Sequence, residues 1–160
     1  MEHEGRIIDA SISTSADPQQ VWEAWTDPEK ISQWFPDKAT GEAKPGSTFT
    51  WIFEKFNYVF PLRVVEATPP SHLVLQGDIP GQRPLITEIT IERQGGRTLL
   101  RLVNSGFDET GRFDDEFEGT RCGWPIALEI LKLYLENYFG QPRRTVILLR
   151  PRAVSYDQLW

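Results

Sequence analysis

The sequence has very little of the material from which disulfide frameworks and metal centres are built. Among its 160 residues there is one cysteine, Cys122, and there are two histidines, His3 and His72. A single cysteine excludes a disulfide framework and a four-thiolate zinc site. Two histidines leave little for any other metal cluster, so we expect neither a metal nor another cofactor.

Long apolar runs and enzyme signature motifs are also missing. No apolar run approaches the roughly 18 residues of a membrane-spanning helix, and the N-terminus lacks the charged-then-apolar pattern of a signal peptide. There is no Gly-x-Ser-x-Gly nucleophile motif and no glycine-rich phosphate loop. We therefore expect a soluble cytoplasmic protein that does not associate with membranes, and the sequence favours a binding protein over an enzyme.

Basic residues are scarce in most of the chain and gather near its end. Residues 1–140 carry 13 basic and 22 acidic side chains, a net charge of −9, whereas residues 141–160 carry four arginines against Asp157, a net charge of +3. An acidic body repels a phosphate backbone, so we expect no nucleic-acid partner. A short basic segment more commonly settles on an acidic protein surface.

Aromatic rings are abundant, with six Trp, nine Phe and four Tyr, and they indicate a core or a cavity built from rings. The length is that of one domain. Alternation of apolar and polar residues predicts a half-buried strand over Arg6–Ser15. Asp17-Pro18 and Asp27-Pro28 each place a capping residue before a proline at the first helical position, which predicts two short helices.

From Gly41 to Phe107 the apolar residues recur with a period of two, which predicts an antiparallel meander with the first strand paired at one edge of the same sheet. The predicted strands are Ser47–Glu54, Asn57–Ala67, His72–Gly77, Leu85–Arg93 and Thr98–Phe107. A long helix follows, from about Glu116 or from Trp124 to Phe139, and Pro125 either starts this helix or kinks it. The predicted fold class is α+β, a curved antiparallel sheet wrapped around a long C-terminal helix.

Two polar side chains, Thr87 and Asn104, fall on otherwise apolar inner rows of the predicted strands. A buried polar group without a partner costs about 1–3 kcal/mol. We therefore expect each of the two to meet another side chain, a water or a ligand.

The last twenty residues extend beyond the predicted fold. Residues 1–140 account for the sheet and the long helix, whereas residues 141–160 contain a β-prone run, Thr145–Leu149, and end in Trp160. An apolar extension is not expected to stay in water. Two interpretations remain open: the extension adds a strand to its own sheet, or it reaches a second copy of the chain as a dimer arm.

A series of short motifs in a fixed order resembles a known family. The motifs are Ala16-Asp17-Pro18-Gln19-Gln20-Val21-Trp22, Trp25-Thr26-Asp27-Pro28, Ile31-Ser32-Gln33-Trp34-Phe35, Val64-Val65-Glu66-Ala67, Pro69-Pro70-Ser71-His72-Leu73, Gly96-Arg97-Thr98-Leu99-Leu100, Ser105-Gly106-Phe107 and Gly123-Trp124. This order resembles the START/Bet v 1-like (SRPBCC) superfamily, within the group similar to the C-terminal domain of the heat-shock-protein-90 ATPase activator. The resemblance covers about Arg6 to Phe139 and implies a helix-grip fold.

The resemblance also implies a function: a hydrophobic small molecule, such as a lipid, a polyketide or a flavonoid-like compound, bound between the sheet and the last helix. Ring-lined walls with a few polar groups are typical of such pockets. The candidate ligand-binding residues are Trp34, Phe35, Trp51, Phe53, Leu62, Val64, Leu75, Thr87, Ile89, Leu100, Leu102, Asn104, Trp124, Leu128 and Leu131. The competing interpretation is that these side chains only fill the core.

Two other classes of function remain open beside ligand binding. Some members of the superfamily are cyclases or hydrolases, but we assign no catalytic residue, because the carboxylates of Asp108–Glu118 read as a solvated loop and Asn104 stands where many relatives carry a histidine. The third class is protein partnering, either as a chaperone-associated module or as a homodimer through residues 141–160. The N-terminal domain of the chaperone activator has no counterpart in this sequence.

Overall fold

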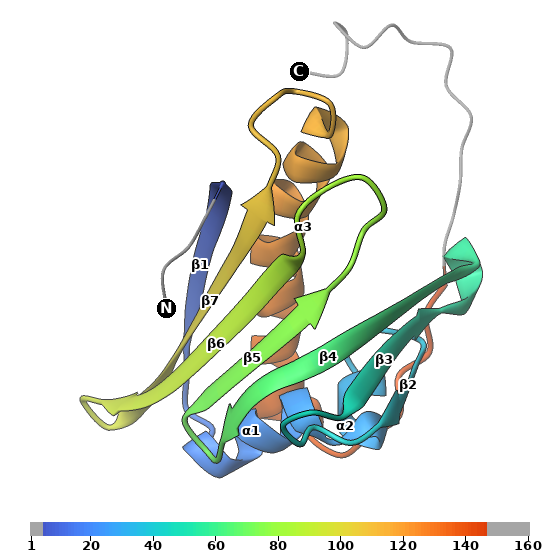
Figure 1. Cartoon of the computed structure of the whole chain (residues 1–160). Coiled ribbons are helices and arrows are strands. Elements are labelled where there is room, and N and C mark those ends of the chain that lie inside the picture. Colours follow the sequence, from blue (N-terminus) through green and yellow to red (C-terminus); the bar gives the residue numbers. More distant parts are fainter. Residues whose placement is uncertain (1–4, 147–160) are drawn as a thin grey trace, which may run out of the picture.

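One curved sheet and one long helix organise the molecule, and the computed structural model describes residues 5–146. Seven antiparallel strands form the sheet in the order β1-β7-β6-β5-β4-β3-β2, as Figure 1 shows. Their bounds are β1 (Arg6–Thr14), β2 (Lys38–Gly41), β3 (Thr48–Phe53), β4 (Tyr58–Thr68), β5 (His72–Gly77), β6 (Leu85–Gln94) and β7 (Arg97–Phe107). The α+β class, the meander and the edge position of the first strand are confirmed.

Two short helices, α1 (Pro18–Thr26) and α2 (Pro28–Ser32), lie at one end of the sheet (Figure 1). Asp17 caps α1 by accepting a hydrogen bond from the Gln20 amide, and Asp27 caps α2 by accepting from the Glu29 amide. A helix of this length is not stable alone. The buried faces of α1 and α2 therefore owe their order to the core beneath them.

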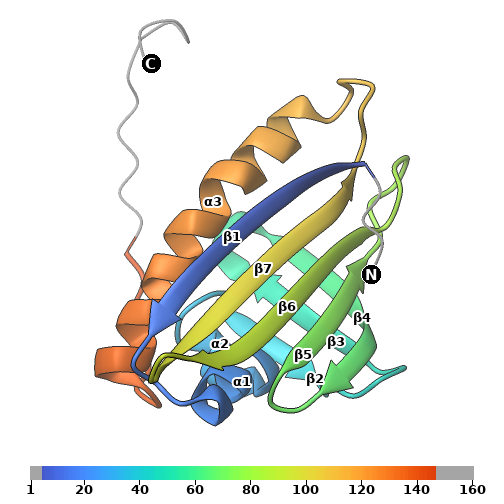
Figure 2. The same ribbon diagram turned by 90° about the vertical axis from the view of Figure 1, so that its left-hand side faces the viewer.

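The long helix, α3 (Asp114–Leu133), continues into the short π-helical turn η2 (Tyr134–Tyr138). It runs along the concave side of the sheet beside β1, which Figure 2 shows clearly. Pro125 lies inside the helix, so the interpretation that the helix starts before it is the correct one. An apolar row on the other side of α3, which includes Ile126 and Leu133, faces solvent, with exposed fractions of 64% and 54%.

The predicted strands are all present, and β2 is the addition. Its four residues, Lys-Ala-Thr-Gly, show no apolar alternation, and it pairs with β3 at the edge of the sheet, where Ala39 faces Trp51. A short 3-10 helix, η1 (Glu54–Phe56), joins β3 to β4. On β5, Gly77 makes room for a ring: a Cβ there would overlap the Phe60 side chain.

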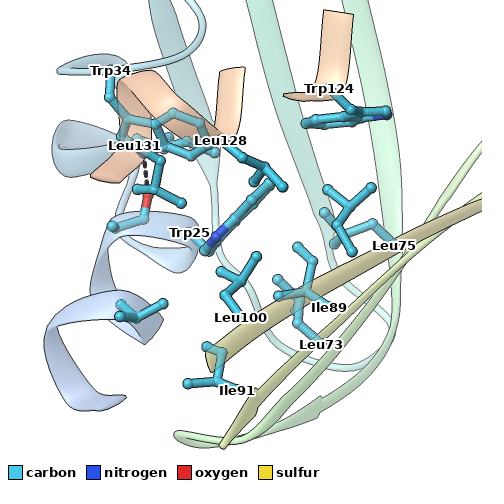
Figure 3. Close-up of a cluster of buried hydrophobic side chains, with 14 of the residues drawn as sticks. Trp25, Trp34, Leu73, Leu75, Ile89, Ile91, Leu100, Trp124, Leu128 and Leu131 are labelled. Carbon is cyan, nitrogen blue, oxygen red and sulfur yellow. Dashed lines mark hydrogen bonds between the residues drawn. The ribbon is translucent and has the colours of Figure 1, made fainter. Parts of the chain in front are cut away.

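A dense core fills the end of the molecule near α1 and α2. Trp25 and Trp34 meet edge to face with centroids 4.9 Å apart, and the Trp34 indole N–H donates to the Ala24 carbonyl at 2.9 Å. Figure 3 shows the Trp25 ring between Leu128 of α3 and Leu100 of the sheet. We call this filled region the closed end; its members are Trp25, Trp34, Leu73, Ile89, Ile91, Leu100, Leu128 and Leu131.

The helices of the described part of the chain are amphipathic or short. Within residues 5–146, none is both long and apolar enough to cross a membrane.

Candidate ligand-binding site

A cavity of about 350 Å³ lies between the sheet and the N-terminal half of α3. We call this region the open end, because its mouth reaches the surface. Its lining residues are Phe35, Trp51, Phe53, Tyr58, Phe60, Ile79, Leu85, Thr87, Asn104, Phe107, Glu116, Gly119, Thr120 and Trp124. The volume falls in the range of small-molecule sites, about 300–1,000 Å³.

Aromatic side chains from β3 and β4 form one wall of the cavity. Phe53 stacks on Tyr58 with centroids 6.2 Å apart, and Tyr58 stacks on Phe60 at 5.9 Å. Trp51 lies two residues before Phe53 on β3, and its ring centroid is 6.3 Å from that of Phe60. These side chains all point to the inner face of the sheet because they alternate along their strands.

Phe35, which follows α2, closes a second side of the cavity. Its ring stacks on Trp124 of α3 at 5.3 Å and meets the Trp51 and Phe53 rings edge on, at 5.1 and 5.5 Å. Phe35 therefore joins the wall of β3 to the helix. Offset and edge-to-face arrangements are the favourable ones for aromatic pairs.

Arg143 holds the segment that carries Phe35. Its guanidinium donates to the carbonyls of Trp34 at 2.7 Å, Phe35 at 2.8 Å and Pro36 at 2.9 Å. Burial lowers the pKa of the Arg143 guanidinium, and the nearby carboxylate of Asp37 acts in the opposite direction. The chain after α3 is thus tied to the cavity wall by a half-buried cation.

Asn104 and Thr87 form a polar floor whose hydrogen bonds are made within the protein. The Asn104 amide donates to the Ile86 carbonyl at 2.9 Å and to Thr87 Oγ1 at 3.2 Å. Its Oδ1 accepts from the Trp124 indole N–H at 3.2 Å. Asn104 and Thr87 are therefore hydrogen-bonded to each other, and Asn104 is also bonded to Trp124. This network fixes the orientation of the Trp124 ring.

The mouth of the cavity combines a ring with groups of α3. Tyr58, 47% exposed, stands on the sheet side, and partial burial raises the pKa of its phenol. Glu116, Gly119 and Thr120 stand on the helix side, and the Thr120 hydroxyl donates to the Glu116 backbone carbonyl at 2.7 Å. Gly119 has open space where a side chain would project.

The structure divides the fifteen predicted site residues into two groups. Six of them line the cavity: Phe35, Trp51, Phe53, Thr87, Asn104 and Trp124. The other nine are buried in the core and do not line it: Trp34, Leu62, Val64, Leu75, Ile89, Leu100, Leu102, Leu128 and Leu131. That the first group binds a ligand stays a prediction.

Several lining residues were not predicted from the sequence, although a signal existed for some of them. Phe60 continues the inner row of β4 that includes Leu62, and Leu85 begins the inner row of β6, so alternation identifies both. Glu116, Gly119 and Thr120 depend on where α3 begins, which the sequence left open. Ile79 and Phe107 gave no signal, because a loop and a strand end set their positions.

Two other features of the described residues are less suited to a guest. A larger hollow, about 530 Å³, lies among the polar loop residues around Gln82 and Asp108, and only Phe107 contributes a ring to it. On the outer face of the sheet, His72 is held between Glu66 at 2.8 Å and Glu88 at 2.7 Å. No group of three or more metal-ligating side chains gathers anywhere in residues 5–146.

The fold and the cavity together define a class of protein. A curved antiparallel sheet that grips a long C-terminal helix, with a ring-lined space between them, is the helix-grip architecture of the START/Bet v 1-like superfamily. The chain belongs to the family described as Activator of Hsp90 ATPase homolog 1-like protein, which matches residues 15–136. The resemblance seen in the sequence is therefore confirmed.

Solved structures share this fold at low sequence identity. The protein MLL2253 from Mesorhizobium loti superposes with a TM-score of 0.73 and 24% identity, over 81% of this chain and 96% of its own. The Aha1 dimer from Colwellia psychrerythraea gives a TM-score of 0.71 and 21% identity, over 83% and 98%. CalU16 from Micromonospora echinospora gives 0.67 and 23%, over 82% and 76%. No curated protein matches the sequence.

Proposed function

We propose that the protein binds a hydrophobic small molecule in the open end, without chemical change to it. The observation that carries the proposal is the cavity itself: aromatic rings surround about 350 Å³ of space in a molecule whose closed end is tightly filled. A lipid, an aromatic polyketide or a flavonoid-like compound has the matching apolar surface. Burying apolar surface contributes roughly 25 cal/mol per Å², so a guest of this kind gains affinity without any charged contact.

The polar floor supports binding rather than catalysis. Asn104 and Thr87 are hydrogen-bonded to each other, and Asn104 also accepts from Trp124. A general acid or base must reach the reacting group with a titratable side chain. In this cavity the titratable side chains are Tyr58 and Glu116, and both stand at the mouth rather than beside the buried part of a guest.

Two glycines of α3 allow a direct test of the site. Gly119 lines the cavity, whereas Gly123 does not, and a side chain at either position meets open space. We expect flavonoids, aromatic polyketides or lipids to raise the melting temperature of the wild-type protein, since a ligand of the native state stabilises it by mass action. Gly119→Leu should block the mouth and abolish this increase.

Gly123→Leu is the matched control and should keep the increase, because Gly123 lies one helical turn further along α3 and does not line the cavity. Both substitutions replace a helical glycine, so both should stabilise α3 slightly. Equal responses of the two variants to every compound, or no response of the wild type to any compound, would contradict the proposal.

A second candidate is self-association through the outer face of α3. Ile126, Ile130 and Leu133 are exposed there as one apolar row, and the relative from Colwellia psychrerythraea is described as a dimer. The predicted dimer arm, residues 141–160, lies outside the described residues from position 147 onward. We propose that a second copy of the chain covers the row.

Light scattering tests this candidate. Leu133→Glu should halve the apparent mass, while Lys132→Glu on the neighbouring position should not. A monomeric mass for the wild type would refute self-association.

A chaperone-associated role, which the family name raises, is tested separately by adding the protein to a heat-shock-protein-90 ATPase assay. An unchanged ATPase rate would refute that role.

A further inference from the structure

Among the residues that the structure describes, a single charged side chain lines the open end, and it is acidic. None of the lining residues is Lys, Arg or His, and Glu116 is the one carboxylate among them. An anionic ligand therefore finds no counter-charge on the walls that residues 5–146 form. A charge that leaves water without a partner pays a large desolvation penalty.

Glu116 differs from two of the other acidic residues at the start of α3, Asp114 and Glu118, because its carboxylate is not engaged in an ion pair. Asp114 pairs with Arg6 at 2.6 Å, and Glu118 pairs with Arg121 at 2.5 Å. Within residues 5–146, the Glu116 side chain makes no ion pair and no hydrogen bond. Its charge is therefore available to whatever occupies the mouth.

The rings at the mouth act in the same direction as Glu116. Phe53, Tyr58 and Phe60 stack in a row, and all three side chains line the cavity. The face of an aromatic ring is electrically negative, so it attracts a cation and repels an anion. Tyr58 adds no negative charge, since an ordinary phenol is protonated at neutral pH and burial raises the pKa of Tyr58 further.

The inner part of the cavity, as the described residues form it, offers an anion no cation, and the donor that Trp51 leaves without a partner there, its indole N–H, is neutral. The amide N–H groups of Asn104 are used by the Ile86 carbonyl and by Thr87, and the Trp124 indole N–H is used by Asn104. A carboxylate turned inward would have to break this network. An anionic guest turned inward therefore meets at most one neutral N–H, that of Trp51, whereas an apolar body with a cationic end at the mouth places its charge beside Glu116.

We propose that the ligand is a flat, largely apolar molecule whose polar end is cationic, and that Glu116 is the residue that selects this charge. The inference rests on the proposed binding function and adds the class of ligand to it. Affinity should fall in the order cation, neutral molecule, anion. Free fatty acids and other apolar carboxylates would then be excluded as ligands.

Three probes that share one ring system test the order: 2-naphthylmethylammonium, 2-naphthalenemethanol and 2-naphthoate. Titration calorimetry at low ionic strength should give the ammonium compound about fivefold tighter binding than the alcohol, and the carboxylate about fivefold weaker binding, as expected for one partly exposed charge contact with a cation–π contribution. The advantage of the ammonium compound should shrink at high salt, because salt screens an exposed charge pair.

Glu116→Gln should bring the ammonium compound and the alcohol to within about twofold of each other, since one exposed ion pair accounts for most of the difference. Asp115→Asn is the matched control. Asp115 is the adjacent carboxylate of α3, it is exposed, and it does not line the cavity, so its loss should leave the order unchanged. An equal effect of the two substitutions would show that the total negative charge at the start of α3 sets the order, and it would overturn the specific role of Glu116.

The outcomes separate this inference from the proposed function. If all three probes bind equally and Gly119→Leu blocks them, the cavity binds apolar molecules but charge selection is refuted. If the carboxylate binds best, the inference is refuted as well. If none of the probes binds, both the inference and the proposed function fail.

Discussion

The two ends of the molecule share one sheet and one helix, yet one is solid and the other is hollow. At the closed end, Trp25 and Trp34 pack edge to face and Leu128 and Leu131 of α3 fill the space above the sheet. At the open end, the rings of Trp51 and Trp124 border an empty volume instead. Architecture alone therefore does not decide whether this fold has a binding site.

The size of the side chains on α3 explains the difference. The second half of α3 and the turn η2 present leucines to the sheet, at Leu128, Leu131 and Leu135. Toward the cavity the first half presents Glu116, Gly119 and Thr120, which are short or turned toward water, while its Phe117 packs on Phe107. A close-packed interior needs side chains of matching volume on both surfaces. Large rings from the sheet opposite small residues of the helix leave a space.

The largest expected effect separates the two ends by stability. Trp25→Ala should lower the free energy of unfolding by about 3–5 kcal/mol, because a fully enclosed ring leaves a cavity behind. Phe53→Ala should cost at most about half as much, since its ring already faces empty volume on one side. Urea unfolding of the two variants measures both values. Equal losses would mean that the open end is packed in solution.

A smaller effect concerns the tie between the chain after α3 and the cavity wall. Arg143→Ala removes three hydrogen bonds from a half-buried cation and should cost about 2 kcal/mol of stability. It should also weaken binding in the open end, because Phe35 loses its fixed position. Arg144→Ala is the control: Arg144 is exposed and makes no hydrogen bond or ion pair within residues 5–146. Its loss should change neither quantity, and a matching loss in both variants would refute the tie.

The elements of the fold were predictable because their signals are local. Asp17 and Asp27 cap their helices as the Asp-Pro pairs predict, and the alternating strands lie where alternation places them. β2 could not be found this way, because an edge strand of four residues has no buried row of its own. The start of α3 was left open because a proline inside a helix and a proline at its start give the same sequence signal.

The candidate site was predictable only in part. Thr87 and Asn104 were predicted to be buried and to need partners, but which partners stayed open. The structure places them opposite each other on β6 and β7, in the register that the tight turn at Gly95-Gly96 sets. The position of the cavity could not be predicted, because it depends on which side of Pro125 the helix begins and on the small side chains it then presents. The sequence does not distinguish inward-facing residues of the two ends. Leu100 and Trp51 are both apolar residues at inward positions of alternating strands, yet only Trp51 lines the cavity.

The smallest expected effect lies on the face of the sheet that points away from the cavity. Burial alone would lower the pKa of His72, but its hydrogen bonds to Glu88 and Glu66 outweigh burial and raise the pKa. A raised pKa in the folded state contributes stability that is complete below the unfolded value, about 6.5, and is lost as the pH rises through the folded pKa. The wild type should therefore lose more stability than His72→Gln between pH 5.5 and pH 8.5, by less than about 1 kcal/mol. Thermal unfolding at both pH values measures the difference, and binding of 2-naphthalenemethanol should be the same in the two proteins, because the sheet separates His72 from the cavity. A pH dependence of equal size in His72→Gln would place the titrating group elsewhere, and altered binding would show that the outer face and the open end are coupled.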